Sequence, residues 1–529
     1  MAIGDVTFVK GQGGLGRPLP GEDFISGLTL YYPTGKLPSG IVSGQAYTLF
    51  QASDAQTKLN ILPSYNAGNL YADANFADAT AAQATIEITG GGVAGEAITI
   101  VANVLSAGGV VTPVTLCTYT LVSGDSVAAA LAGHIELAIK ANTFNTGFSA
   151  TISSETVSVV FPLSQGIYPN TGTPVTVSPS TGHTFTFTLT QPSSATSGVP
   201  SVQAFWNYQV QEYFRIQPKG QLWVSFTAAY SGAYNFAEVY NLQQASGGRI
   251  RQLGVLQHTS VAYASSYLSS LQTQINSCDV NHMPLSALYA ADLSATADLS
   301  TLTNLATLSA NKVSAVISQD GNSWGAFLYA TSGKSVPTLG AALGAVSLAA
   351  VNESIEWRSK FNISNGFECD TPALANGQLI QSVSQNYLDQ LDASRYIFLI
   401  KNIGFSGSYF NGSHAAVSAT SDYAYIENNR TIDKAIRGVY SSLLPALGAP
   451  IVLNSDGTLT DESISYFTSL AELNLREMAR NTELSAFEVL IDSTQNVLST
   501  NNLVVAVELL PVGVARAITV NIGFVVALS

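Results

Sequence analysis

The chain has 529 residues, of which 46% are apolar and only 11% are charged, and its formal net charge is −14. This length leaves room for several domains. The negative charge and the lack of any Lys/Arg cluster argue against nucleic acid or an anionic membrane as the main partner, because both require a basic face. A surface with so little charge lacks the repulsion that keeps monomers apart, and it suits a protein packed against copies of itself. An ordinary secreted β-rich protein has a similar composition.

The three cysteines, Cys117, Cys278 and Cys369, are odd in number and far apart. They therefore predict free thiols and a reducing compartment during assembly, not a disulfide framework. The first residues lack the basic region and apolar core of a signal peptide. No apolar run reaches the ~18 residues needed to cross a bilayer, so we expect no direct membrane insertion.

The chain opens with a short strand, "DVTFV", followed by "KGQGGLGRPLPGEDF" and a second strand, "SGLTLYYP". Residues Gly11 to Gly16 match the G-x-G-x-x-G pattern of dinucleotide sites. Such a site needs a helix to begin at the glycines, so that its N-terminus holds the pyrophosphate. Pro18 and Pro20 prevent that helix, and we interpret the stretch as a connector without a cofactor.

Residues 82–192 are rich in Thr, Val, Gly and Ser, and strand-like runs recur in them. One helix is expected over 125–142, with Asp125 as its cap. Its apolar stripe would consist of Val127, Leu131, Ile135 and Ile139. This pattern predicts an inserted β-sandwich-like domain, with 193–202 as the exit linker.

Residues 203–355 alternate strands and helices, which favours α/β layering together with residues 21–81. Within them "GNSWG" (321–325) matches the nucleophile elbow G-x-S-x-G, with Ser323 as nucleophile. The only histidine downstream is His414, in a polar loop with nothing expected to orient its ring. We therefore favour a tight turn after a core strand over a serine hydrolase.

Metal and nucleotide motifs are also lacking. Cys278 and His282 have C-x-x-x-H spacing, but no second pair completes a zinc site. "NSDGTLTDES" lacks the calcium-loop ladder and predicts a turn before a helix. No Walker motif is present. The sequence therefore predicts no enzyme activity and no catalytic, cofactor or metal site.

Two amphipathic helices are expected in residues 356–510. The first, "RTIDKAIRGVYSSLLP", ends at Pro445 and would bury one apolar face. That face consists of Ile432, Ile436, Val439 and Leu443. The second begins after Thr460, a candidate cap, with Asp461 and Glu462 in the first turn, where the helix dipole favours them. "PVG" (511–513) is expected to turn the last two strands around.

The last residues alternate between a large apolar face and a small face, as a strand does. The apolar face consists of Ile518, Val520, Ile522, Phe524, Val526 and Leu528, and no charged residue follows Arg516. An unprotected sticky edge predicts addition to a sheet of another subunit. The N-terminal residues Ile3, Val6 and Phe8 predict a second such arm. The alternative is a sheet closed within the chain's own domain.

The layout as a whole resembles the contractile tail sheath proteins of tailed phages and related injection machines. The resemblance covers residues 1–81 and 203–529. It is carried by "GLGRPLPGEDFISGLTLYYP", "GGRIRQLGVLQ", "VSAVISQDGNSWG", "VPTLGAALGAVSLAAVNESIEW", "YIENNRTIDKAIRGVYSSLLPAL" and the terminal strand pair. It implies an α+β, multi-domain sheath-like core with an inserted β-sandwich-like domain and extended strand arms at 1–20 and 511–529.

The resemblance also implies a function. Such subunits polymerise with themselves around an inner tail tube and contract without a nucleotide, with the domain at 356–510 facing the tube. Baseplate and tail terminator proteins are the further partners, and the location is the virion tail, assembled in the host cytoplasm. Residues 82–192 could contact a receptor or a glycan, or only decorate the surface. Other structural roles, such as a tail tube, adhesin or layer protein, remain as alternatives.

Overall fold

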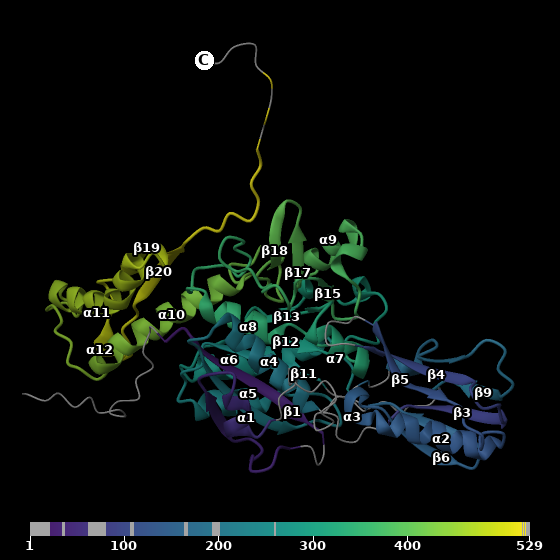
Figure 1. Ribbon diagram of the computed structural model, residues 1–529. Coiled ribbons are helices and arrows are strands. Elements are labelled where there is room, and N and C mark those ends of the chain that lie inside the picture. The colour runs from purple at the N-terminus through teal and green to yellow at the C-terminus, as the bar shows by residue number, and fades with distance from the viewer. Residues whose placement is uncertain are drawn as a thin grey trace, which may run out of the picture.

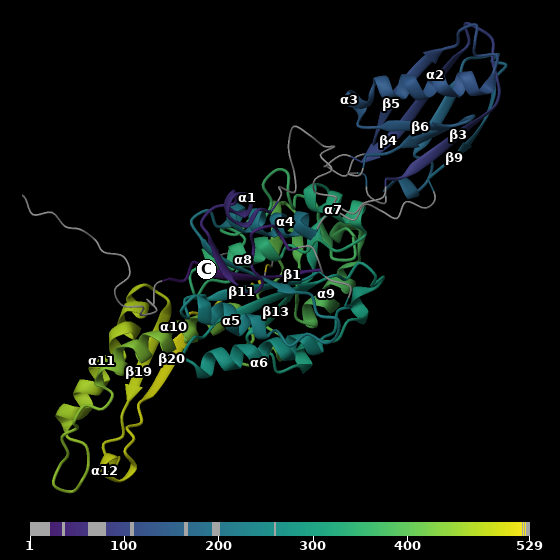
Figure 2. The same cartoon turned by 90° about the horizontal axis from the view of Figure 1, so that it is seen from below.

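The computed structural model describes residues 22–33, 37–61, 81–105, 111–162, 165, 168–192, 202–258, 261–520, 522 and 524. The N-terminal residues Ile3, Val6 and Phe8, the Gly11–Gly16 connector, and Val526 and Leu528 lie outside these ranges. Helices and several separate sheets confirm the predicted α+β class. In Figure 2 the residues of the insertion and the carboxyl-terminal helices lie at opposite ends of a central body. None of the described helices is both long and apolar enough to cross a membrane.

The central body is built on a seven-stranded sheet of order β16-β13-β12-β11-β1-β10-β2. All pairs are parallel except β2 with β10. Its strands are β1 (Ile25–Tyr32), β2 (Ala46–Leu49), β10 (Gln221–Ala228), β11 (Gln252–Gln257), β12 (Ser286–Ala291), β13 (Val313–Val316) and β16 (Tyr396–Ile397). The central strands are buried along their whole length, as expected for a parallel sheet covered on both faces.

Helices cover both faces of this sheet (Figure 1). One core cluster contains side chains of α5 (Ala237–Ala245) and α6 (Ser266–Val280). The other contains those of α4 (Val202–Ile216) and α8 (Leu339–Leu348). The α4–α8 packing is close, because a Cβ atom at Gly340 would lie 2.1 Å from the carbonyl oxygen of Gln209.

The main sheet does not end at the expected boundary between residues 355 and 356. Strand β16 forms its edge, where Ala315 and Val316 of β13 pair with Tyr396 and Ile397. The expected boundary followed a change in local composition. A two-residue strand that pairs with residues 81 positions earlier leaves no local signal. The shorter elements nearby are α1 (Asp54–Leu59), β14 (Ser318–Asp320), α7 (Trp324–Ser332), β15 (Pro372–Leu374), α9 (Gln385–Ala393), β17 (Leu399–Asn402) and β18 (Phe405–Phe410).

The inserted residues form two antiparallel sheets, β6-β7-β3-β9 and β5-β4-β8, with their own apolar core. The strands are β3 (Gln83–Gly90), β4 (Ala97–Leu105), β5 (Val111–Thr120), β6 (Ser149–Ser153), β7 (Thr156–Val160), β8 (Val175–Pro179) and β9 (Thr186–Thr190). Helix α2 (Ala128–Ala141) packs on this core, and α3 (Thr143–Thr146) follows it.

Asp125 does not cap α2, in contrast to the prediction. The helix begins three residues later, with Val127 as its cap and 59% exposed. Asp125 is fully buried instead and accepts hydrogen bonds from the Val122 amide (2.7 Å) and the Tyr119 hydroxyl (2.8 Å). His134 Nδ1 lies 2.6 Å from its other oxygen. The aspartate therefore stabilises the turn before the helix.

The carboxyl-terminal unit consists of α10 (Ile426–Leu443), α11 (Asp461–Arg480), β19 (Leu484–Leu490), α12 (Val497–Thr500) and β20 (Ala506–Pro511). Thr460 caps α11 as predicted, since its side chain accepts a hydrogen bond from the Ser463 amide. The "PVG" turn prediction is wrong. Strand β20 pairs with β19, and the chain after Pro511 runs away from the body as an extended segment (Figure 1).

The predicted apolar face of α10 is not its buried face. Ile436 is 47% exposed, whereas the charged side chains of Arg430, Asp433, Lys434 and Arg437 are buried. Opposite charges stabilise this burial, because the Lys434 Nζ atom lies 2.8 Å from Asp23 and 2.6 Å from Glu483. Periodicity alone therefore assigned the wrong face, since the ion-pair partners are distant in the sequence.

Candidate assembly surface

The carboxyl-terminal arm, described for residues 512–520, 522 and 524, leaves the body as an extended chain (Figure 1). Ile518, Val520, Ile522 and Phe524 are 81%, 70%, 91% and 110% exposed. Soluble monomers rarely leave such a continuous apolar row in water, and rows of this kind mark interaction sites. The described part of the predicted apolar face is therefore present and uncovered within one protomer.

The hairpin of β19 and β20 is the second element of this surface. It is a sheet of only two strands, with Ala486 paired to Leu510 and Leu490 to Ala506. Within the residues that the structure describes, no third strand covers either outer edge. An isolated two-stranded sheet is marginal in water, and an unpaired edge is a template for a further strand. One face of the hairpin packs on α10 and α11 through a small core around Leu475 and Leu484.

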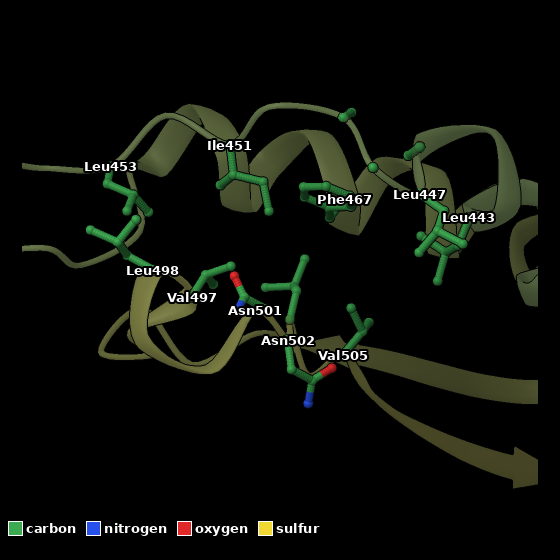
Figure 3. A pocket seen from close by; sticks show the side chains of 14 residues that line it. Leu443, Leu447, Ile451, Leu453, Phe467, Val497, Leu498, Asn501, Asn502 and Val505 are labelled. Atoms are coloured by element: carbon green, nitrogen blue, oxygen red, sulfur yellow. The ribbon is translucent and has the colours of Figure 1, made fainter.

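An apolar hollow of about 570 Å³ lies beside the hairpin, between the end of α10, α11 and α12 (Figure 3). Its apolar lining includes Leu443, Leu447, Ile451, Phe467 and Leu498. Leu447 is 83% exposed and Leu498 is 78% exposed. The hollow and the hairpin together give the carboxyl-terminal unit an apolar outer surface.

The base of the arm contacts the body through the side chain of Arg516. The Arg516 guanidinium pairs with the carboxylates of Glu356 and Glu427. Its central carbon lies 3.5 Å from the centre of the Tyr425 ring. In the sequence Arg516 stands out only as the last charged residue. Its three partners could not be found there, because they are distant in the sequence.

The predicted arm residues do not gather into one site. Ile518, Val520, Ile522 and Phe524 lie on the extended arm, while Ile3, Val6, Phe8, Val526 and Leu528 are outside the described residues. Strand donation by these residues to a neighbouring subunit stays a prediction.

Ser323 does not meet a catalytic histidine in the part of the chain that is described. It is buried before α7, where its amide donates to Asp320 Oδ2 (2.6 Å) and its side chain lies beside Asp320 and Glu368. His414 is held elsewhere, with Nε2 2.9 Å from Asp392 Oδ1. The expectation that nothing orients this imidazole is wrong, yet its partner is not the serine.

Metal-binding geometry is likewise not found among the residues with described positions, which contain no group of three or more His, Cys, Asp or Glu suited to an ion. Cys278 is buried in the core of the body, and burial raises the pKa of its thiol to about 12. His282 stacks on Tyr440 instead, with ring centres 4.2 Å apart.

Residues 422–529 match the family described as "DUF2586, C-terminal domain". No curated protein matches the chain. Among solved structures, a sheath tail protein from Listeria innocua shares 11% identity and a TM-score of 0.38 over 94% of this chain and 93% of that chain.

Two injection-system structures are also similar. A chain of the anti-feeding prophage baseplate shares 13% identity and a TM-score of 0.40, over 60% of this chain and 80% of that one. A chain of the contracted sheath complex of the PVC extracellular contractile injection system shares 13% identity and a TM-score of 0.38, over 61% and 80%. These likenesses are too distant to establish what this chain does.

Proposed function

We propose that the chain is the sheath subunit of a contractile tail or contractile injection system, and that it polymerises through strands exchanged between neighbours. The observation that carries this proposal is that one chain has both an uncovered apolar arm and a hairpin with an open edge. Because each protomer exposes both a strand to donate and an edge to accept one, copies of it can bind head to tail. Such a contact generates rings or helical filaments.

In this proposal the arm of one copy adds to the edge of the β19–β20 hairpin of the next. Main-chain hydrogen bonds give affinity, and pockets for alternate side chains fix the register. The four described apolar side chains of the arm would each contribute ~1.5–3 kcal/mol on burial, an upper limit for the hydrophobic gain. Ordering and association costs remove part of that gain.

The remaining parts of the proposal rest on the sequence resemblance. The subunits surround an inner tail tube, meet baseplate and terminator proteins at the two ends, and shift during contraction while the exchanged strands keep the lattice continuous. The carboxyl-terminal unit lies nearest the tube. The inserted domain lies on the outside, where it could meet a receptor or a glycan. The energy is stored in the extended assembly, so no nucleotide takes part.

Electron microscopy of the purified chain, with and without residues 518–529, tests this proposal. We expect hollow cylinders wider than a bare tail tube from the full chain and only lone subunits from the truncated one. The inserted domain has its own core, so its thermal transition should be unchanged in the truncated chain. Filaments formed equally well by the truncated chain would contradict strand donation.

The runner-up is another structural polymer, such as a tail tube or a layer protein, which would use the same arm. The same images separate the two, because a tube forms thin cylinders and a layer forms flat sheets. A hydrolase that uses Ser323 is not favoured, since the buried serine lies beside two carboxyl groups and not beside an imidazole.

A further inference from the structure

The exposure of the arm to solvent changes at Arg516. Up to this residue every second side chain, Val512, Val514 and Arg516, is half-buried, whereas the apolar side chains of Ile518 and Val520 beyond it are exposed. The Arg516 side chain itself is only 23% exposed, and the carboxylates that it pairs with are 11% exposed (Glu356) and 2% exposed (Glu427). A single guanidinium therefore bridges two separate segments of the body at the point where the arm departs.

The two carboxylates also form hydrogen bonds with residues of the body. Glu427 lies in the first turn of α10, where the helix dipole favours a negative charge, and it accepts a hydrogen bond from Ser413 Oγ (2.7 Å). Glu356 accepts one from Ser354 Oγ (3.2 Å), and the two serine hydroxyls lie 3.2 Å apart. This network orients both acceptors toward one position.

The charge balance of the site requires a cation there. Burial raises the pKa of Glu356, the charge of Arg516 opposes that shift, and the neighbouring Glu427 adds to it. Without the guanidinium, the two buried carboxyl groups would face each other with no cation between them, which is costly. A planar guanidinium can satisfy two carboxylates and stack on an aromatic ring at once, which an ammonium group cannot do.

Tyr425 is the third residue that contacts Arg516, and neighbouring residues hold it in place. It is the residue immediately before α10, and its backbone bridges to His414. A second guanidinium, that of Arg395, lies 4.8 Å from the centre of the same ring and donates to the carbonyl oxygens of Ala415 and Ala424. The ring is therefore a rigid platform for Arg516.

Helix α10 also packs against the β19–β20 hairpin. Near the other end of α10, Asn474 of α11 donates hydrogen bonds to the Gly438 carbonyl (2.9 Å) and to Ser442 Oγ (2.6 Å). Ala435 joins the small core that contains Leu484 of β19. Helix α10 has 18 residues, a length of ~27 Å at 1.5 Å per residue. The helix therefore connects the base of the arm, at Tyr425 and Glu427, with the hairpin, which packs near its middle at Ala435.

We propose that Arg516 is a positioning residue: its contacts with Glu356, Glu427 and Tyr425 fix the base of the arm to its own protomer and set the direction in which the arm reaches a neighbour. This inference rests on the proposed strand exchange for its consequence, but the contact itself belongs to the single chain. A fixed base reduces the conformational freedom that the arm loses on binding, so it favours assembly without touching the neighbour.

Spin labels on the full chain, below the concentration at which it assembles, test the contact directly. The native cysteines are buried, so labels attach to cysteines introduced at the exposed positions 518 and 403. We expect a narrow distance distribution in the parent and a broad one in Arg516→Ala. The double variant Arg516→Ala/Glu427→Gln removes the more buried of the two unpaired carboxylates, so like charges no longer face each other, and it should show the same broad distribution.

The matched control is Arg476→Ala, because Arg476 forms an exposed pair with Glu472 on α11. It should leave the label distribution unchanged. Equal distributions in the parent and both Arg516 variants, or equal broadening in the control, would overturn the proposal.

Assembly provides the functional readout. Arg516→Ala should raise the protein concentration needed for assembly by about tenfold or more, the factor that corresponds to one lost charge-assisted hydrogen bond. Arg516→Lys should restore part of this loss. Methylguanidinium at millimolar concentration should not restore assembly of Arg516→Ala, because a free cation can neutralise Glu356 and Glu427 but does not connect the arm to them.

Rescue by the free cation would show that Arg516 only neutralises the two carboxylates, and that result would count against the proposal. If the parent does not assemble at all, the proposed function fails while the label experiment still decides the contact.

Discussion

Lys434 of α10 and Glu483, the residue before β19, form a buried ion pair with 2.6 Å between Nζ and Oε1. The same Nζ atom lies 2.8 Å from Asp23, which precedes the first strand of the main sheet. One ammonium group thus connects the carboxyl-terminal unit to the start of the central body. Charges buried in this way are stable only as a complete set.

Replacing Lys434 by Ala should therefore destabilise the protein strongly, since Glu483 would remain buried without its cation and Asp23 would keep only Arg437, at 3.3 Å. We expect a loss of about 3–5 kcal/mol in the free energy of unfolding, measured by denaturant titration. The control is Lys58→Ala, because Lys58 is exposed and its partner Asp54 keeps hydrogen bonds from the Phe50 amide and Gln51. Its loss should be at most about 1 kcal/mol. Equal losses in both variants would contradict this account of α10.

Glu368 should make stability depend on pH. Burial and the charges of Asp320 and Glu212 raise its pKa to about 7, against a hydrogen bond from the Trp324 amide that lowers it. Folding thus favours the protonated carboxyl. This contribution is fully present below about pH 4.5 and is lost as the pH rises through about 7.

The variant Glu368→Gln stays neutral and keeps the contribution at high pH. At pH 8 it should be more stable than the parent by up to about 3 kcal/mol, with a much smaller gain at pH 5, as read from thermal transitions at both values. Glu87→Gln makes the same change at an exposed position of β3 and should show no such gain. A gain for Glu368→Gln that is equal at both pH values would refute the titration.

A charge on the arm should block assembly without affecting the fold. Ile522 is 91% exposed, so Ile522→Asp should leave the unfolding transition within about 0.5 kcal/mol of the parent. Assembly, followed by sedimentation, should be lost because the aspartate would be buried in the neighbour's sheet. Thr519→Asp places the same charge on the small face and should have the weaker effect. A stronger loss of assembly in Thr519→Asp than in Ile522→Asp would show that the small face of the arm, and not the large apolar face, is buried in the neighbour.

The three cysteines should not react with a thiol reagent in the folded protein. All three are buried and free, and burial raises the pKa of the Cys117 thiol to about 11. Because the thiolate is the reactive form, absorbance after addition of an aromatic disulfide should show no rapid reaction until denaturant is added. A thiol that reacts at once in native buffer would show that one of these positions opens to solvent.

The sequence by itself determined the features that depend on neighbours a few residues apart. Thr460 precedes an amphipathic run and caps α11, and the mixture of period-two and helical patterns specified the α+β class. The row from Ile518 to Phe524 was visible as an alternation, because strand geometry places every second side chain on one face.

The tertiary structure alone decided which faces are buried and which distant charges meet. The sequence pattern favoured Ile436 as a buried residue of α10, but paired charges from Asp23 and Glu483 allow the polar face to be buried instead. Arg516 is an ordinary surface charge in the sequence, and only the fold brings Glu356 and Glu427 to it from 160 and 89 residues away. Short-range patterns follow from backbone geometry, whereas ion pairs of this kind exist only once the chain has closed on itself.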